Sequence, residues 1–271
     1  MDSIEAYKIA ARYYEFIASG RNHFELQVRV VNELIKRYRL KKPRILDAAC
    51  GSGEVLNLLL DDGANAYGCD GSPDMLILAQ QFLTAKQNAR LYPACKWQDL
   101  GSLLQKERFD LIFVLGHAFP LLKPAEIPGV IEAIFEGLNP DGVFAFDMRQ
   151  WIRADNGQLR ESGRPVDVRR WMGEHALTKG KRFLLDDCCT YSAQSQRITY
   201  SVQHLDPNHQ PDDCDFTFEY TLFDVDDVTR WFAYSPFRHN IAFHWPKGRV
   251  GDNKWEWPFT VVVAKKRAPA E

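Results

Sequence analysis

A run of small residues at positions 47–54 (DAACGSGE) carries the strongest chemical signal in the sequence. The residues before it read as a short buried strand, and those after it read as the start of a helix. Gly51 and Gly53 let the backbone come close to a ligand, and backbone amides at a helix start favour an anionic group. The run therefore predicts a ligand site at the end of the first core strand.

Asp70 completes this signal. It stands 19 positions after Gly51, at the end of a second predicted strand, where a carboxylate can accept hydrogen bonds from both hydroxyls of a ribose. Asp70 could instead only cap the helix that Ser72 begins, but its distance from the glycine turn favours ribose binding. The two features together indicate a nucleoside-containing cofactor at the carboxyl ends of the strands.

Two classes of cofactor are bound by such a pair. The NAD fingerprint is G-x-G-x-x-G, whose third glycine permits close packing of helix on strand, and Leu56 stands at that position here. The strand that ends in Asp47, the absent third glycine and a closing pair of strands near the C-terminus instead resemble the class I S-adenosylmethionine-dependent methyltransferases. The resemblance covers about residues 40–147 and 224–266, and it implies S-adenosylmethionine as cofactor and S-adenosylhomocysteine as product.

Three further segments look like motifs of that family. Residues 70–76 match the motif whose acid holds the ribose and whose residue at Met75 packs on adenine. Residues 97–100 match the motif that lines adenine, and residues 115–119 match the one beside the methyl group and the acceptor. Met75 and Trp97 could equally be ordinary core residues. The resemblance thus implies a cofactor site made of Ala49, Gly51, Gly53, Asp70, Gly71, Met75, Trp97, Gln98, Asp99 and Leu115.

Two stretches, 115–122 (LGHAFPLL) and 146–151 (FDMRQW), are similar to the glycine and glycine/sarcosine N-methyltransferases. In that group an arginine at the position of Arg149 binds the substrate carboxylate. An arginine in the helical lead-in, for which Arg21 is the candidate, neutralises the carboxylate of the cofactor's methionine part. The resemblance implies methylation of the amine of an amino acid or a related carboxylate-bearing compound.

This closer match leaves several alternatives open. His117 stands where that group usually has asparagine, and Gln150-Trp151 replace Asn-Tyr, so the acceptor is not fixed. Arg149 could pair with Asp147 or Asp155, and Arg21 could be a solvated charge.

The candidate catalytic residues are His117 and Arg149. A neutral amine needs no base, whereas a hydroxyl acceptor would be helped by one, and His117 would then be that base or simply a structural histidine. O- or C-methylation of a small metabolite, an NAD-dependent oxidoreductase and a non-catalytic adenosine-ligand-binding module remain as alternative functions.

The elements that must position these residues alternate between strand and helix. Two helices, at about 7–17 and 23–40, precede the first strand. The core strands are predicted at about 44–49, 64–69, 90–97, 109–115 and 143–147, with helices at 54–60, 72–87 and 127–138 between them. This order predicts an α/β protein with a doubly wound, Rossmann-like parallel sheet. The resemblance adds a count of seven strands, with the last one antiparallel beside the fifth.

The pattern changes after the fifth strand. Between about 165 and 223 several segments alternate with period two, and on two of them Ile198, Tyr200 and Phe216, Phe218 mark the apolar faces. These segments predict an antiparallel β insertion between the fifth strand and a last core helix at 226–234. We therefore expect N-terminal helices covering the active site at 1–40, a cofactor-binding core at 41–150 and 224–271, and a substrate lid at 151–223.

Composition bounds the class of partner. The chain has 271 residues with 34 Lys plus Arg and 36 Asp plus Glu, so its net charge of -2 gives no electrostatic case for nucleic acid or an anionic membrane. A base-amino methyltransferase is also disfavoured, because no Asn-Pro-Pro-Tyr type motif follows the fourth strand. These features favour a small-molecule acceptor and leave a homo-oligomer open.

The cysteines and the N-terminus bear on metal and location. The six cysteines form no CxxC pair and have no histidine at zinc-ligand spacing, so no metal is predicted. Asp2 and Glu5 stand where a signal peptide would be basic. We expect a cytoplasmic protein.

Overall fold

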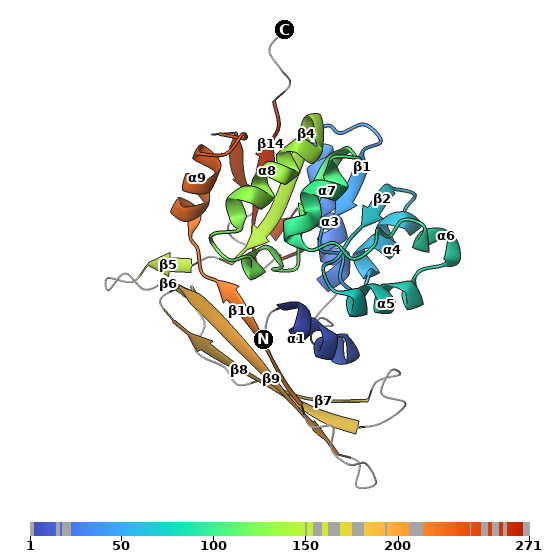
Figure 1. The fold of residues 1–271 in the computed structure, drawn as a ribbon, viewed down its shortest axis with the longest axis vertical. Coiled ribbons are helices and arrows are strands. Elements are labelled where there is room, and N and C mark those ends of the chain that lie inside the picture. Colours follow the sequence, from blue (N-terminus) through green and yellow to red (C-terminus); the bar gives the residue numbers. More distant parts are fainter. Residues whose placement is uncertain are drawn as a thin grey trace.

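The central element of the chain is a mixed β-sheet (Figure 1). The structure, a computed structural model, describes residues 3–14, 17, 23–149, 151–153, 159–161, 169–174, 182–192, 194–205, 214–238, 240–244, 249–250, 255–256 and 259–267. Within these residues the sheet has six strands in the order β11-β14-β4-β3-β1-β2. Their bounds are Arg44–Asp47 (β1), Asn65–Gly68 (β2), Phe109–Val114 (β3), Leu138–Met148 (β4), Ile241–His244 (β11) and Thr260–Lys265 (β14).

The strand directions follow the predicted plan. β1 pairs in parallel with β2 and with β3, and β3 pairs in parallel with β4. β14 lies antiparallel beside β4 and pairs antiparallel with β11 on its other side. The chain is therefore a mixed α/β protein whose main sheet is dominated by parallel strands.

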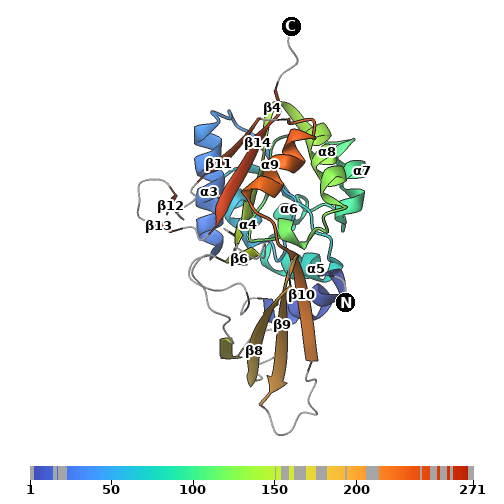
Figure 2. The same cartoon turned by 90° about the vertical axis from the view of Figure 1, so that its left-hand side faces the viewer.

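Helices cover both faces of this sheet because its strands are apolar on both sides. In β3, Leu111 and Phe113 belong to one core cluster, whereas Ile112 and Val114 belong to the other. α3 (His23–Arg37) and α4 (Glu54–Asp61) pack on the first face, and α7 (Leu100–Leu104), α8 (Ile127–Gly137) and α9 (Val225–Ala233) pack on the second. Figure 2 shows α3 on one side of the sheet and α7 and α8 on the other.

The predicted third strand is wrong as a full element. Between residues 90 and 97 the chain makes only an isolated parallel bridge, in which Leu91 faces Gly68 at the end of β2. The amide of Tyr92 donates to the carbonyl of Gly68, but the next donor to this neighbouring segment is the amide of Cys95, to the carbonyl of Asp70, so the pairing slips by one residue and no regular ladder forms. The chain then forms a short 3-10 turn, η2 (Trp97–Asp99). For this reason the described sheet has six strands rather than seven.

The predicted helix over 72–87 is divided in two. Ser72 caps α5 (Pro73–Phe82) by accepting a hydrogen bond from the amide of Met75, as its sequence suggested. Thr84 then opens a separate short helix, α6 (Ala85–Asn88), with a capping box to Gln87.

The absent third glycine of the cofactor turn has a structural counterpart on the neighbouring strand. A Cβ added at Gly68 of β2 would lie 2.9 Å from Cδ2 of Leu56 on α4. The close approach of this helix to the sheet is thus allowed by a glycine on the strand instead of on the helix.

A separate antiparallel sheet lies between β4 and α9 in the chain. Its order is β10-β9-β8-β7, with bounds Cys214–Thr221, Ser195–His204, Arg182–Tyr191 and Arg169–Glu174. Two small hairpins, β5 (Trp151–Arg153) with β6 (Leu159–Glu161) and β12 (Arg249–Val250) with β13 (Trp255–Glu256), complete the described strands.

The N-terminal segment joins this second sheet to the core. α1 (Ser3–Ala10) and the 3-10 turn η1 (Ala11–Tyr13) pack Ala6, Ala10 and Tyr13 against the apolar face of β9 and β10. Ala11 packs on the other side against Met75 and Leu78 of α5. Figure 1 shows α1 between the core and the second sheet. Every helix among the described residues is too short or too polar to cross a bilayer.

Candidate active site

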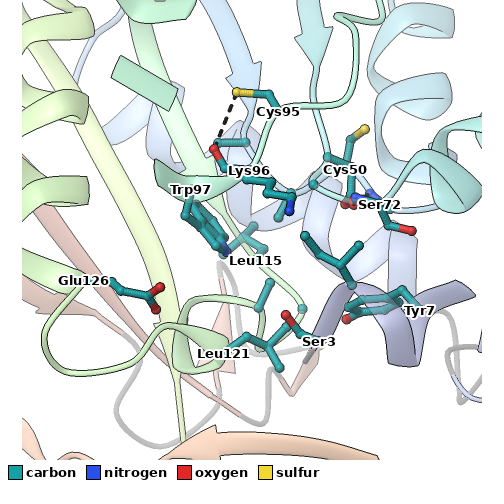
Figure 3. Close-up of a pocket in the computed structure, with 18 of the residues that line it drawn as sticks. Ser3, Tyr7, Cys50, Ser72, Cys95, Lys96, Trp97, Leu115, Leu121 and Glu126 are labelled. Atoms are coloured by element: carbon teal, nitrogen blue, oxygen red, sulfur yellow. Dashed lines mark hydrogen bonds between the residues drawn. The ribbon is translucent and has the colours of Figure 1, made fainter. Parts of the chain in front are cut away.

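A cavity of about 1050 Å³ opens at the carboxyl ends of β1, β2 and β3. It is bounded by three parts of the chain. The core supplies the turns at 47–52, 70–72, 95–99 and 115–118, α1 supplies Ser3, Ile4 and Tyr7, and the second sheet supplies Ser192, Gln194, Ser195, Glu219 and Thr221. Figure 3 shows Trp97 and Leu115 across the cavity from Cys50 and Ser72, with Ser3 and Tyr7 of α1 at its edge.

Asp70 lies at the centre of the core side of this cavity. Its Oδ2 accepts a hydrogen bond from the amide of Gly51 at 2.9 Å, and its Oδ1 accepts one from the amide of Ser72 at 2.8 Å. Burial raises the pKa of Asp70, and the amides of Ser72, Gly51 and Gly71 act in the opposite direction. A carboxylate has about four acceptor positions, so Asp70 can hold these turns and still accept the hydroxyls of a ligand.

Gly51 and Gly53 both adopt left-handed backbone conformations, with φ of +53° and +82°. Gly51 lines the cavity. Gly53 does not line the cavity. It caps the start of α4 and packs against α5, where a Cβ on Gly53 would lie 2.9 Å from the Cβ of Ala79. The second glycine is therefore needed for packing beneath the turn, and the first for the surface that a ligand would touch.

Asp47 supports the same turn from the end of β1. It is buried, and its Oδ1 accepts a hydrogen bond from the amide of Ala49, which itself lines the cavity. Burial raises the pKa of Asp47 to about 8, and the charge of Asp70 adds to the rise. The two carboxyls thus interact across the glycine turn.

Most of the residues predicted to surround adenine line one cavity. Gly71, Trp97, Gln98, Asp99 and Leu115 all line the cavity, together with Cys95 and Lys96 from the loop that replaces the third strand.

Met75 does not line the cavity. It is fully buried on the inner face of α5, where its Cε lies 3.5 Å from the position of a Cβ on Gly51. It lies in the core directly below the glycine turn, and its contact with adenine stays a prediction.

Two tyrosines of the N-terminal segment line the cavity and were not expected from the sequence. Tyr7 of α1 packs its ring on Phe218 of β10 at 4.6 Å, and Tyr14 brings its hydroxyl to 3.4 Å from the Cβ position of Gly51. Burial raises the pKa of both phenols, so both are neutral donors. Only a long-range contact brings them to the site, so no local motif marks them. Arg21, the predicted partner of a cofactor carboxylate, lies outside the described residues.

The end of β3 forms a tight turn over the cavity. Gly116 and His117 both have left-handed φ values, +77° and +64°. Their amides donate to Oδ2 and Oδ1 of Asp147 at 2.9 and 2.8 Å. Leu115, Gly116 and Ala118 line the cavity, but His117 does not.

The His117 ring stacks on two aromatic side chains instead. The ring centroid of Tyr220 of β10 lies at 5.0 Å and that of Phe259 at 5.5 Å, both in stacked orientation. Both ring nitrogens are buried without a hydrogen-bond partner among the described residues. Burial and the charge of Arg149 hold the pKa of His117 well below its usual value, so the ring is neutral.

Arg149 follows β4 on the same side of the sheet. Its guanidinium lies 5.9 Å from the ring of Phe259. Burial raises the pKa of Asp147 to about 7 and that of Tyr220 to about 12, and the charge of Arg149 opposes both rises. The two predicted catalytic residues are thus neighbours, but neither lines the cavity. The alternative partner Asp155 and the adjacent Gln150 lie outside the described residues.

Comparison with known proteins agrees with this geometry. Residues 45–142 match the model of a family described as a methyltransferase domain. A putative methyltransferase, YqeM of Bacillus subtilis, is 30% identical over 110 residues, 40% of this chain and 43% of the relative. A glycine/sarcosine N-methyltransferase of Halorhodospira halochloris is 31% identical over 124 residues, 45% of this chain and 44% of the relative. The matched segments thus span less than half of these relatives.

A likeness in fold extends over nearly the whole chain. The sugar N-methyltransferase KedS8 from Streptoalloteichus sp ATCC 53650 superimposes with a TM-score of 0.70 at 20% identity, covering 94% of this chain and 93% of that one. Together these matches confirm the resemblance to S-adenosylmethionine-dependent methyltransferases that the glycine turn and Asp70 indicated.

Proposed function

We propose that this chain, which contains a methyltransferase domain at residues 45–142, transfers a methyl group from S-adenosylmethionine to the amine of a small polar molecule. One observation carries the proposal. A single cavity is lined at one side by the glycine turn and Asp70 and at the other by the polar residues of the antiparallel sheet. A donor and an acceptor bound there would share one enclosed space.

The cofactor side fits the nucleoside part of S-adenosylmethionine. The remaining acceptor positions of Asp70 suit ribose hydroxyls, and Trp97 and Leu115 offer apolar surface beside them. When bound, the cofactor supplies an electrophilic methyl group on a sulfonium. The volume of about 1050 Å³ exceeds that of most single-ligand pockets, which leaves room for a small acceptor.

The acceptor side favours a polar amine. The second sheet lines the cavity with Ser192, Gln194, Ser195, Glu219 and Thr221, all of them hydrogen-bonding groups. Such a lining suits an acceptor that carries hydroxyls as well as an amine, and KedS8, the structural neighbour, is described as a sugar N-methyltransferase. Arg149, the carboxylate partner that the resemblance implied, does not line the cavity, which favours a hydroxylated amine over an amino acid.

No catalytic base is needed in this scheme. Enclosure beneath the second sheet desolvates an ammonium and lowers its pKa, so that the amine reaches the donor in its neutral, nucleophilic form. The chain's main contribution is then to orient the amine in line with the sulfur–methyl bond and to exclude water. The low pKa of His117 argues against a base of the kind that O-methylation would use.

The antiparallel sheet and α1 act in this proposal as the cover of the site. Residues 151–223 would serve as a substrate lid, with α1 connecting it to the cofactor side through Tyr7. A cavity walled by the core on one side and by the second sheet and α1 on the other suits a small molecule better than a nucleic acid.

Isothermal titration calorimetry with S-adenosylhomocysteine tests the cofactor. We expect micromolar binding to the wild-type protein, at least tenfold weaker binding to Asp70→Asn, and unchanged binding to Asp74→Asn, a neighbouring carboxylate that does not line the cavity. NADH serves as the parallel ligand. Binding of NADH alone, or of neither ligand, contradicts the proposal. If S-adenosylhomocysteine binds as expected, amino sugars, amino acids and simple amines are screened as methyl acceptors.

A further inference from the structure

The carboxylate of Asp147, near the end of β4, binds the turn that follows the neighbouring strand β3. Asp147 is fully buried near the end of β4, and Phe146 before it pairs with Val114, the last residue of β3. Beyond that pair, Oδ2 and Oδ1 of Asp147 accept the amides of Gly116 and His117 at 2.9 and 2.8 Å. The side chain thus continues the contact between the strands after the backbone ladder has ended.

The turn held in this way has a backbone that most residues avoid. Gly116 and His117 are consecutive left-handed residues, and for histidine this conformation is strained. This backbone conformation decides which residues of the turn face the cavity. Leu115, Gly116 and Ala118 line the cavity, whereas the His117 ring stacks on Tyr220 and Phe259.

The same turn also seats the second sheet. Tyr220 belongs to β10, whose neighbouring residues Glu219 and Thr221 line the acceptor side of the cavity. A shift of His117 would therefore move Leu115 on the core side of the cavity. It would also weaken the contact between His117 and Tyr220, which holds β10 on the acceptor side.

We infer that Asp147 is a positioning residue for the proposed methyl transfer: by binding both amides it fixes the 115–118 turn, and with it the wall of the cavity where the acceptor meets the donor. The inference rests on the proposed function. It predicts that Asp147 matters for turnover although it does not line the cavity, and that the affinity for the cofactor, which depends mainly on Asp70 and the glycine turn, falls less than turnover does.

Asp147→Asn tests this with little change in shape. The amide keeps one acceptor oxygen and turns an NH₂ group towards the second backbone N–H, so one hydrogen bond is lost and a buried donor is left without an acceptor. Asp110→Asn is the matched control, because Asp110 lies at the opposite end of β3 and its Oδ2 likewise accepts a backbone amide, that of Arg44 at 2.8 Å.

Three readouts separate positioning from general stability. We expect hydrogen exchange of the Gly116 and His117 amides, followed by NMR, to accelerate about tenfold or more in Asp147→Asn, which is the loss of one hydrogen bond. The kcat for the best acceptor found in the screen should fall about tenfold or more. The affinity for S-adenosylhomocysteine should fall by a smaller factor than kcat, because Asp70 and the glycine turn keep their contacts and only Leu115 shifts. Asp110→Asn should show wild-type exchange at 116 and 117 and wild-type kcat.

Two outcomes overturn the inference: unchanged exchange at both amides in Asp147→Asn, or accelerated exchange with unchanged kcat. Failure of the wild-type protein to bind S-adenosylhomocysteine would instead overturn the proposed function, and the exchange data would still decide whether Asp147 holds the turn. If Asp147→Asn does not fold, Gly116→Ala loosens the same turn from the other side, since its φ of +77° disfavours alanine. Accelerated exchange at His117 and reduced kcat are again expected, and the absence of either overturns the inference.

Discussion

The carboxylate of Asp70 accepts a hydrogen bond from the amide of Gly51 at 2.9 Å, which joins the end of β2 to the turn after β1. The turn can present this amide because Gly51 is left-handed, with φ of +53°. Tyr14 and Met75 close in on the same glycine, at 3.4 and 3.5 Å from the position of a Cβ. The ligand-facing turn is thus held by a charged group from the side and by packed side chains from two helical segments.

Gly51→Ala should weaken both folding and cofactor binding. An alanine at this φ is strained by roughly 1 kcal/mol, and its methyl group would occupy cavity-lining space in van der Waals contact with Tyr14 and Met75. Displacing the turn also moves the amide that faces Asp70. We expect a lower melting temperature and at least tenfold weaker binding of S-adenosylhomocysteine, measured by thermal unfolding and calorimetry.

Gly63→Ala is the matched control for this variant. Gly63 has φ of +81° and no atom within 4 Å of its Cβ position, so alanine there brings backbone strain without a clash or a contact with the cavity. The control should lose a similar amount of stability and keep wild-type affinity. Equal losses of affinity in the two variants would show that the effect of Gly51→Ala is only one of stability.

The sequence predicts those parts of the site that local patterns encode. The glycine turn, Asp70 at the end of the second strand and the Ser72 cap are short motifs, and the structure contains each of them. The third strand fails because its weak apolar pattern makes one bridge and the pairing then slips by one residue, so that Cys95 donates to Asp70. Leu56 breaks the glycine fingerprint of the helix, but the space it needs comes from Gly68 on the facing strand.

The features that the sequence could not predict depend on contacts between distant segments. Tyr7 reaches the cavity only because α1 packs between the second sheet and α5. His117 follows a buried strand as expected, but two left-handed residues and Asp147 turn its ring away from the cavity. The resemblance to N-methyltransferases marks His117 and Arg149, yet the direction of each side chain is set by tertiary packing.

Asp47 should make stability depend on pH. Its folded-state pKa of about 8 lies above the usual value near 3.9 for an unfolded chain, so between about pH 4 and pH 8 the folded state binds more protons. The contribution of the protonated carboxyl is full below about pH 4 and is lost as the pH rises through about 8.

Asp47→Asn has no such titration and still offers an oxygen to the amide of Ala49. The free energy of unfolding of the variant, relative to wild type, should therefore rise between pH 5 and pH 9, by at most about 1.4 kcal/mol per pH unit. Urea unfolding at a series of pH values measures this difference. A difference that stays constant with pH would mean that the carboxyl of Asp47 has the same pKa in the folded and the unfolded chain.

His117→Asn should leave the pH dependence of turnover unchanged. Asparagine tolerates the left-handed conformation, so the turn held by Asp147 is retained while the stacking on Tyr220 and Phe259 is lost. Because the wild-type ring is already neutral, no ionisation of residue 117 contributes to the profile. If the pH profile of kcat lost an acidic limb in the variant, His117 would be a general base, and the argument for an amine that needs none would be wrong.

Arg149→Gln distinguishes the two acceptor classes. Arg149 lies beside Phe259 and outside the cavity lining, so we expect the KM for a hydroxylated amine to stay within about threefold of wild type. Arg230→Gln, at an exposed ion pair with Asp227 on α9, controls for the loss of a positive charge. Steady-state kinetics with an amino acid and an amino sugar measure both. A selective rise of KM for the amino acid in Arg149→Gln, absent from the control, would show that Arg149 reaches the cavity and binds the carboxylate, which would make a carboxylate-bearing amine the better acceptor.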